Sequence, residues 1–356
     1  MKRLLTSTAA FCTLAFAAHA ELTVVSWGGS YEKSQVEAYN KPFTASTGIQ
    51  VKMTSADNPA SPIKSMVESG NVTIDVADLE YTDAIRLCDE GLLEPLDPAS
   101  LPAAPDGTPA TEDFLEGALT DCAVGSMVFS TVYGYDSSKF TERKPTTIAD
   151  FFDLEAFPGK RGMRKDPKAN LEMALMADGV PATEVYKTLE TEEGMNRAFA
   201  MLDKIKSQTI WWEAGAQPPQ LLADGEVAMT TAYNGRLFSA VVTEGKPFAT
   251  VWDGQVYEFE LFAIPKGAPN KDQALEYIKF ATDTQRLADQ TKWISYGPAR
   301  QSSLPLVGTF EDGKTSMSPH MPTAEANMTN ALRQSFEFWV DRNDEISERF
   351  NTWLAK

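Results

Sequence analysis

The sequence predicts an α/β fold of two lobes, each a largely parallel sheet with helices on both faces. Short β-branched, apolar runs alternate with segments of helical periodicity, an order typical of parallel strands separated by helices. The chain has 356 residues, more than one domain usually contains, so two lobes are expected. The apolar stretch 124–135 is too long for an ordinary strand and can cross from one lobe to the other.

Residues 1–20 are predicted to be a secretory signal peptide. Lys2 and Arg3 precede a mostly apolar stretch over residues 4–18, and Ala18-His19-Ala20 is a small-x-small cleavage site. The apolar part is too short to span a membrane, and no later stretch approaches the ~18 apolar residues of a membrane helix. We expect cleavage after Ala20 and a soluble protein in the periplasm.

The first half of the exported chain reads as strands alternating with helices. Ser30 can cap the helix that follows the first strand, and glycines at positions 48, 70 and 91 end or follow the first helices. The expected strands are residues 22–27, 49–53 and 74–77, and the expected helices are residues 30–47, 63–69 and 82–88.

A proline-rich loop over residues 95–109 separates this half from the long stretch 124–135, and the second half repeats the alternation. Asn270 can open the last long helix of this pattern, and no heptad or solenoid repeat is present. The expected helices are residues 171–176, 195–205 and 274–288, and the expected strands are residues 227–233 and 259–264.

The charge and the cysteines limit the possible partners and the compartment. Export removes Lys2 and Arg3 from the 32 basic residues but none of the 50 acidic ones, so the formal net charge falls from −18 to −20. Such a field disfavours nucleic acid and anionic membranes and favours cationic solutes, although simple solubility also accounts for it. Cys88 and Cys122 remain, 34 residues apart, and predict one disulfide; the alternative is two buried thiols.

The motifs of common enzymes are missing, so we expect no catalysis, no cofactor and no metal. His320 is the only histidine of the exported chain, and GxSxG, HExxH and GxxxxGK[ST] motifs are absent. Asp341, Asn343 and Glu345 loosely resemble a calcium loop, but Ile346 stands where that loop needs glycine, so a solvated helix is expected. A hydrolase with a carboxylate pair remains an alternative, because many acidic residues allow such a pair.

Four turns that follow predicted strands are candidate ligand contacts, because α/β folds bind ligands at the carboxyl ends of strands. They are Trp27-Gly28-Gly29, residues 78–82, residues 232–236 and residues 258–262. The first can be a plain turn. In the last, Glu258 and Glu260 share one strand face and would repel unless they are solvated or face a cation. An exposed edge strand is the alternative there.

Trp211-Trp212-Glu213 adds aromatic residues beside a carboxylate. Proteins hold ammonium groups with aromatic faces and carboxylates, through cation–π attraction and charged hydrogen bonds. Core packing is the alternative for the tryptophan pair.

Taken together, these stretches resemble the periplasmic substrate-binding proteins of ABC importers, in the branch that includes the spermidine- and putrescine-binding proteins. The likeness covers the whole exported chain, and the order and spacing of the stretches carry it. They are SWGGSYEKSQ, IDVADLEYTDAIRLCDEGLLEPLD, PGKRGMRKDPKANLEMALMADG, WWEAGAQPPQLLADGEVAMTTAYNGR, ELFAIPKGAPNKDQALEYIKFAT and ISYGPAR.

The resemblance implies the type II periplasmic-binding-protein fold, in which two α/β lobes joined by hinge strands close on a ligand. Each lobe is then a mixed, mostly parallel sheet flanked by helices. The implied N-terminal lobe is residues 21–131 plus 259–300, and the implied C-terminal lobe is residues 132–258 plus 301–356.

By position in the family, Trp27 and Gly28 fall in the first ligand loop, and Glu260 matches the carboxylate that holds an amine. The remaining positions are Glu80 and Thr82 where polyamine binders carry a serine and an aromatic residue, Asp166 for a carboxylate of the second lobe, Tyr233 for an aromatic wall and Tyr296 for a later tyrosine. The full candidate set is Trp27, Gly28, Gly29, Glu80, Tyr81, Thr82, Arg164, Asp166, Trp211, Tyr233, Arg236, Glu258, Glu260 and Tyr296.

Some residues depart from the polyamine binders. Glu258 replaces an aromatic residue, Arg236 stands where a small residue is usual, and Arg164 lies near Asp166. An arginine opposite Glu260 would suit a zwitterion with a separate amine and carboxylate. The expected ligand is therefore a polyamine, such as putrescine or spermidine, or an ω-amino acid such as γ-aminobutyrate.

The expected function is a monomeric periplasmic receptor that captures an amine and delivers it to an ABC permease in the inner membrane, with no nucleic-acid partner. Two alternatives remain, a secreted hydrolase and a receptor that docks a sensor protein.

Overall fold

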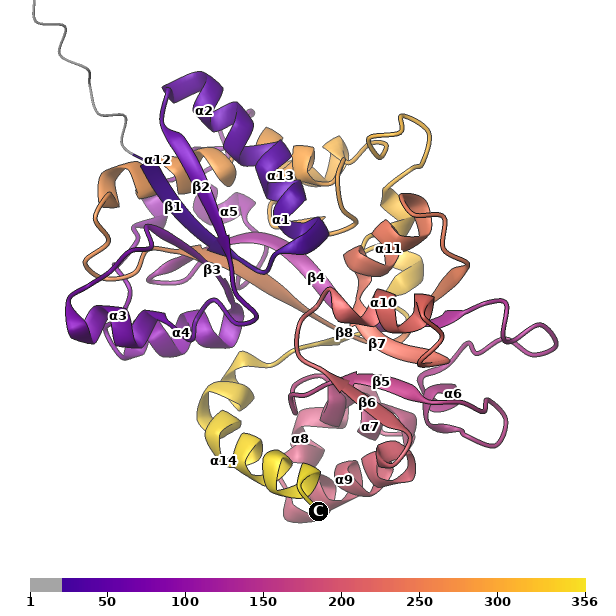
Figure 1. Cartoon of the computed structure of the whole chain (residues 1–356). Helices are drawn as coiled ribbons and strands as arrows, with labels where there is room; N and C mark the ends of the chain where they lie inside the picture. Colours follow the sequence, from indigo (N-terminus) through magenta and orange to yellow (C-terminus); the bar gives the residue numbers. More distant parts are fainter. Residues whose placement is uncertain (1–20) are drawn as a thin grey trace, which may run out of the picture.

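The computed structural model describes residues 21–356, and the predicted signal peptide lies outside the described residues. Within them, ten strands form one mixed sheet, and eight of these follow the order β2-β1-β3-β8-β4-β7-β5-β6 (Figure 1). The remaining two are β10, which pairs with β8, and β9, which pairs with β4. The strands are β1 (Glu21–Ser26), β2 (Gln50–Ser55), β3 (Val76–Glu80), β4 (Ala123–Asp136), β5 (Arg161–Arg164), β6 (Thr209–Trp212), β7 (Met229–Tyr233), β8 (Phe248–Ala263), β9 (Gly297–Pro298) and β10 (Leu332–Arg333).

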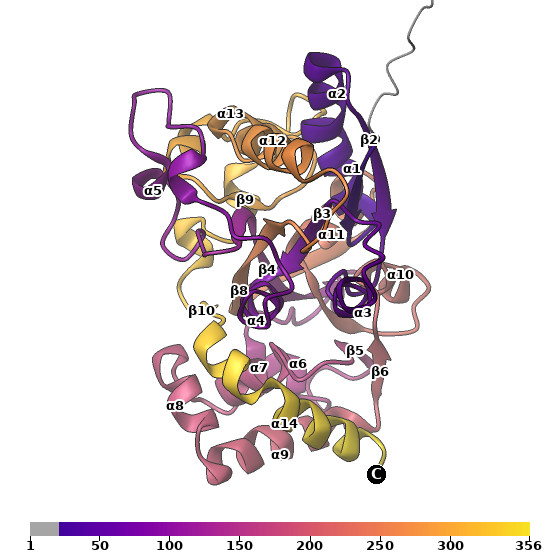
Figure 2. The ribbon, with the colours of Figure 1, turned by 90° about the vertical axis from the view of Figure 1, so that its left-hand side faces the viewer.

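Helices flank this sheet, and Figure 2 shows one group of them around β1–β3 and another around β5 and β6. The α-helices are α1 (Gly29–Gln35), α2 (Lys41–Thr47), α3 (Ile63–Ser69), α4 (Tyr81–Asp89), α5 (Ala110–Asp113), α6 (Ile148–Phe152), α7 (Asn170–Ala177), α8 (Val185–Leu189), α9 (Glu192–Lys206), α10 (Gln217–Ala223), α11 (Asn234–Val242), α12 (Lys271–Ala281), α13 (Thr284–Gln290) and α14 (Phe336–Leu354).

The sheet is parallel at both ends and antiparallel in the middle. β1 pairs in parallel with β2 and β3, and β5 with β6 and β7. Between these groups run the two long strands β4 and β8, antiparallel to each other and to their outer neighbours. The predicted long strand is confirmed as β4, with 14 residues. The predicted strand 259–264 is the end of β8, which has 16 residues and is as long a crossing strand as β4.

Two apolar cores lie at the two ends of the sheet. One contains Phe43 and Tyr277 from helices beside β1–β3, and the other contains Trp339 and Phe350 of α14. β8 contributes Val251 and Val256 to the second core, and its apolar residues from Phe259 onward belong to the first. This change of core supports, as a proposal, a division into lobes 21–131 plus 259–300 and 132–258 plus 301–356.

The predicted disulfide is confirmed. Cys88 near the end of α4 is bonded to Cys122 just before β4, with their Cα atoms 5.8 Å apart. Cys122 is buried in the first core and Cys88 packs against it. The bridge therefore ties α4 to the start of a crossing strand.

Three local expectations are corrected. The helix expected over 274–288 divides into α12 and α13, because the Asp283 side chain accepts the backbone N–H of Gln285 and begins a new helix. Ser30 does not cap α1; Gly28 holds that position with φ 66°. The edge-strand alternative for residues 258–262 is wrong, because β8 lies between β3 and β4.

Residues 341–345 are helical within α14, as expected. None of the helices between residues 21 and 356 combines the length and the apolar character needed to cross a bilayer.

Candidate functional site

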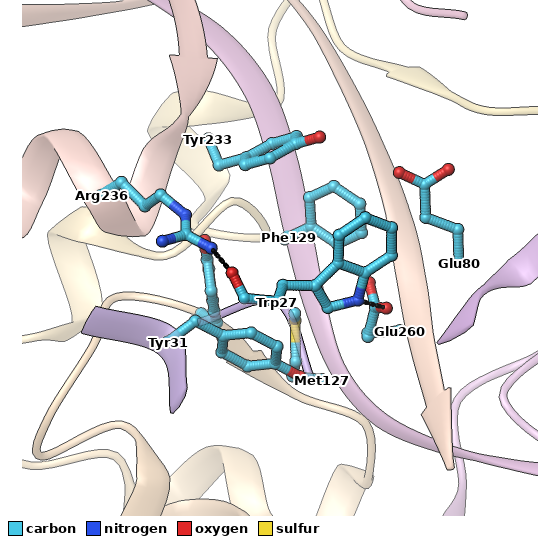
Figure 3. Close-up of a pocket in the computed structure, with 9 residues that line it drawn as sticks. Trp27, Tyr31, Glu80, Met127, Phe129, Tyr233, Arg236 and Glu260 are labelled. Carbon is cyan, nitrogen blue, oxygen red and sulfur yellow. Dashed lines mark hydrogen bonds between the residues drawn. The ribbon is translucent and has the colours of Figure 1, made fainter. Parts of the chain in front are cut away.

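A cavity with an empty volume of about 260 Å³ lies where β1, β3 and β7 end. Trp27 follows β1, Glu80 ends β3 and Tyr233 ends β7, so three of the four predicted turns meet here, and the fourth contributes Glu260 from β8. Figure 3 shows their side chains turned toward one space, which we call the inner cavity. Its lining is Trp27, Tyr31, Glu80, Met127, Phe129, Tyr233, Arg236, Glu260 and Tyr296.

The turn after β1 is shaped to receive the guanidinium of Arg236. Gly28 and Gly29 have φ of 66° and 63°, a left-handed conformation that glycine adopts without strain. A Cβ on Gly29 would lie 2.5 Å from Nη1 of Arg236, so glycine is also needed for space. Nη2 of Arg236 donates to the carbonyl of Trp27 at 3.0 Å and Nη1 to that of Gly28 at 3.2 Å.

Arg236 is a buried cation whose hydrogen-bond donors are only partly paired. It lies in the first turn of α11 and is 4 % exposed. Its Nε–H is buried and has no acceptor among the described residues. The N-terminal end of a helix attracts anions, so a buried cation there is unfavourable unless an anion joins it. This position therefore favours binding of an anionic group.

Glu260 provides the opposite charge. It is 3 % exposed, and Nε1 of Trp27 donates a hydrogen bond to its Oε1. Burial raises the pKa of Glu260 well above its ordinary value, and the nearby charges of Asp78, Glu80 and Glu258 raise it further. A bound ammonium group would offset both effects. Trp27 thus contacts both charged groups, Arg236 through its carbonyl and Glu260 through its indole.

Glu80 also lines the inner cavity, but both of its oxygens are already paired. Nη1 of Arg164 donates to its Oε1 at 2.6 Å, and Nζ of Lys168 donates to its Oε2 at 2.9 Å. Burial raises the pKa of Glu80, but these two charges outweigh that effect and lower the pKa to about 2. Glu80 is therefore ionised at any physiological pH and has little capacity left for a ligand.

Aromatic side chains form the walls of the inner cavity. Phe129 meets Tyr233 edge to face at 5.3 Å between ring centroids, and Tyr31 meets Tyr296 at 5.4 Å. Of the residues lining the cavity, Tyr31, Met127 and Phe129 were not predicted. Met127 and Phe129 alternate along β4, so the period of two in a strand could have identified them together.

The structure does not place Trp211 among the residues that line the inner cavity. Its indole packs against Phe350 and Trp353 of α14, with each ring centroid 5.7 Å away. Trp212 packs edge to face on Tyr233 at 5.7 Å, beside the inner cavity. Neighbouring residues of a strand point to opposite faces, so only one of the pair can lie on the ligand side.

Tyr81, Thr82 and Glu258 line a second cavity with an empty volume of about 240 Å³. Nε2 of Gln334 donates to Oε2 of Glu258 at 2.9 Å, and the hydroxyl of Thr82 is buried without a partner among the described residues. The remaining lining residues of this second cavity are Phe259, Arg333, Gln334 and Phe336.

Asp166 lines neither cavity. Its side chain accepts the backbone N–H of Lys168 at 2.9 Å and shapes the loop before α7. Among residues 21–356, no group of three or more His, Cys, Asp and Glu side chains is placed to hold a metal ion.

Comparison with known proteins matches residues 38–323 to the bacterial extracellular solute-binding proteins. The chain is 44 % identical over 348 residues to a γ-aminobutyric acid-binding protein of Pseudomonas aeruginosa, covering 96 % of this chain and 95 % of that one. It is 22 % identical over 285 residues to the spermidine/putrescine-binding periplasmic protein of Salmonella typhimurium, covering 79 % of each.

Solved structures agree with this match. AgtB of Agrobacterium tumefaciens, solved with agropinic acid, superimposes with a TM-score of 0.83 at 30 % identity, over 95 % of this chain and 99 % of that one. A solved γ-aminobutyrate receptor superimposes with a TM-score of 0.79 at 32 % identity, over 94 % and 98 %. The two-lobed fold expected from the sequence is confirmed by these periplasmic binding proteins.

Proposed function

The chain belongs to the bacterial extracellular solute-binding protein family, and we propose that it is the periplasmic receptor of an ABC importer for an ω-amino acid, with γ-aminobutyrate as the leading ligand. The family match confirms the resemblance to solute-binding proteins that was read from the sequence. The γ-aminobutyrate-binding relative supports the ligand, and the chemistry of the inner cavity supports it independently.

The observation that carries the proposal is the balance of free charges in the inner cavity. Arg236 offers a buried N–H without an acceptor, and Glu260 receives one hydrogen bond only, from Trp27. Glu80 is the third charged lining residue, and two cations already pair with it. The cavity therefore offers one cation and one anion to a ligand, which matches a small zwitterion.

A polyamine fits these groups less well. Each of its ends is an ammonium group and needs a carboxylate, whereas one charged end of the inner cavity is the guanidinium of Arg236. Like charges in a desolvated cleft oppose binding.

We assign the ligand contacts as follows. Arg236 pairs with the ligand carboxylate, which a planar guanidinium can bind in a bidentate manner, and Glu260 pairs with the ammonium group. Trp27, Phe129 and Tyr233 pack against the methylenes between the two ends. Gly28 and Gly29 position Arg236, and Tyr296 completes the wall.

The wider role follows from the family. The exported receptor, cleaved after Ala20, would release its ligand to an inner-membrane ABC permease and act as a monomer without chemistry of its own. Hydrolysis of an amide or glycoside by the purified protein would contradict this part and favour the secreted hydrolase.

Ligand binding by the purified protein tests the proposed function. We expect calorimetry to detect γ-aminobutyrate binding and Arg236→Lys to weaken it by about tenfold or more, because a lysine cannot reproduce the bidentate pair. Arg342→Lys on the surface of α14 is the matched control and should bind as the wild type does. Binding of putrescine or spermidine in preference to γ-aminobutyrate, or unchanged affinity in Arg236→Lys, would overturn the assignment.

A further inference from the structure

We infer that Arg164 and Lys168 determine which amines this receptor accepts, by occupying Glu80 and closing the inner cavity beside Glu260. They would exclude diamines, because a diamine needs a second free carboxylate. Only ligands with a single ammonium group would then bind. This inference rests on the proposed function, since it explains why the site is limited to ω-amino acids.

The three side chains join distant parts of the chain; Glu80 and Lys168 are buried and Arg164 is partly exposed. Glu80 ends β3, Arg164 ends β5, and Lys168 lies in the loop before α7. Lys168 is 7 % exposed and Glu80 2 %, so water screens their attraction poorly. Arg164 also lies over the ring of Tyr233, a lining residue of the inner cavity, with its guanidinium carbon 5.9 Å from the ring centroid.

The loop that carries Lys168 is held in a strained conformation. Ala169 has φ 64°, the one non-glycine residue in the left-handed region among residues 21–356. Nδ2 of Asn170 donates to the carbonyls of Arg164 and Asp166 at 2.7 and 2.8 Å, and the Asp166 side chain accepts the N–H of Lys168. These bonds hold Arg164 and Lys168 in the positions from which both reach Glu80.

Glu80 stands directly beside the carboxylate that we assign to the amine. Glu80 and Glu260 are opposite residues in the antiparallel pairing of β3 with β8, and opposite side chains of such a pair are neighbours. Without Arg164 and Lys168, two free carboxylates would face one another there. That arrangement would favour a ligand with two ammonium groups over a ligand with one.

The second cavity uses residues next in sequence to Glu80 and Glu260. It contains the buried carboxyl of Glu258, two residues before Glu260 on β8, and the unpartnered hydroxyl of Thr82, two residues after Glu80. Both cavities are therefore lined by residues of β8 and of the junction between β3 and α4. At this junction Glu80 lines the inner cavity and Tyr81 lines the second cavity.

Removing one positive charge at a time tests the inference. Lys168→Gln and Arg164→Gln each keep a hydrogen-bond donor for Glu80 but leave its charge half compensated. γ-Aminobutyrate and putrescine are the probes, because they have similar length and differ at one end. We expect calorimetry to detect putrescine binding in both variants, with the preference for γ-aminobutyrate over putrescine reduced by about tenfold or more.

Lys165→Gln is the matched control, because this substitution also removes one positive charge. Lys165 lies next to Arg164 in the sequence, but its ion pair is with the exposed Glu213 and not with Glu80. It should show the wild-type preference. Thermal unfolding of each variant verifies that it is folded before titration. Absence of putrescine binding in both folded variants, or putrescine binding by the wild type, would overturn the inference. Binding of γ-aminobutyrate by the wild type is read separately, and its failure would count against the proposed function instead.

Discussion

Single buried charges decide most of what this site can do, and Glu260 is the clearest case. Its pKa is raised because burial and three neighbouring carboxylates disfavour the ionised form, while the Trp27 indole partly opposes them. A ligand ammonium requires that ionised form. Ligand binding and loss of a proton from Glu260 are therefore coupled.

We predict that Glu260→Gln weakens ligand binding by about two orders of magnitude or more, since removing one partner of a buried charge pair costs about 3–5 kcal/mol. Calorimetry measures this loss. An exposed carboxylate of the neighbouring segment, as in Glu276→Gln on α12, supplies the control. Wild-type affinity in Glu260→Gln would remove this residue from the site.

The same coupling predicts a pH dependence. Because the pKa of Glu260 is raised in the free protein and must fall when an ammonium binds, binding releases a proton, and affinity decreases as the pH is lowered through the raised pKa. Calorimetry in two buffers of different ionisation enthalpy would measure the released proton. If the observed binding heat is the same in the two buffers at every pH tested, no proton is released, and the assignment would be contradicted.

Glu80 governs stability more than binding. Its replacement in Glu80→Gln leaves Arg164 and Lys168 buried without a counter-charge, which should lower the free energy of unfolding by about 3–5 kcal/mol. Denaturant unfolding near neutral pH measures the loss. Glu213→Gln, which removes the exposed partner of Lys165, should change stability little. If the Glu80 variant is as stable as the wild type, Arg164 and Lys168 do not depend on Glu80 as their counter-charge, and the prediction is contradicted.

Helices α7 and α14 meet at another buried carboxyl, Glu172. Nε1 of Trp339 donates to its Oε1 at 2.7 Å and the hydroxyl of Tyr186 at 3.1 Å, so a residue of α7 anchors the C-terminal helix. Burial raises the pKa of Glu172 to about 7 despite these hydrogen bonds. Burial therefore favours the protonated carboxyl, although both hydrogen bonds favour the ionised form.

This pKa predicts how stability depends on pH. The folded protein holds the proton more tightly than the unfolded chain, so the contribution of Glu172 is fully present below its ordinary pKa and is lost as the pH rises through about 7. The loss above that pH is about 3 kcal/mol, from roughly 1.4 kcal/mol per pKa unit.

In Glu172→Gln the side chain still accepts both bonds without ionising, so the decrease in stability between pH 5 and pH 8.5 should become smaller. Urea unfolding at the two pH values measures it. Asp78, whose pKa burial also raises to about 7, should keep part of the decrease. The exposed Glu190→Gln is the control and should show the same decrease in stability as the wild type. A decrease in Glu172→Gln as large as in the wild type would contradict the prediction.

The whole molecule is held together by two apolar cores, two long strands and one covalent bridge. The disulfide lies in the first core, away from the residues that line the inner cavity. Its removal should therefore affect folding stability and leave ligand recognition intact. In the ligand site, by contrast, residues from both halves of the chain meet, as Trp27 and Arg236 do.

We predict that Cys88→Ser with Cys122→Ser lowers the free energy of unfolding by about 3–4 kcal/mol, the chain-entropy value for a loop of this length. Denaturant unfolding measures the change, and ligand affinity of the folded variant should match the wild type. Labelling of the unfolded, unreduced wild type should detect no free thiol. Two labelled thiols, or an unchanged unfolding midpoint in the variant, would contradict the prediction.

Patterns local to the chain were enough to identify most elements and the turns that carry the site. The end of β1 at Trp27-Gly28-Gly29 and the end of β7 at Tyr233 follow from β-branched runs and from glycine, because hydrogen bonding and backbone freedom act between near neighbours. An even pair of cysteines in a chain predicted to be exported was sufficient to predict their bridge. The family likeness then supplied Glu260, and a departure from the polyamine binders, Arg236, suggested its partner across a cleft.

Contacts between distant segments could not be read from such patterns. The pairing of Glu80 with Arg164 and Lys168 depends on how the ends of β3 and β5 meet, and the sequence shows three charged residues among many. Whether Trp211 or Trp212 faces the ligand depends on which face of β6 is covered by α14. Burial and long-range charge are properties of the packed molecule, so they alone separate a carboxylate that can bind an amine from one already neutralised.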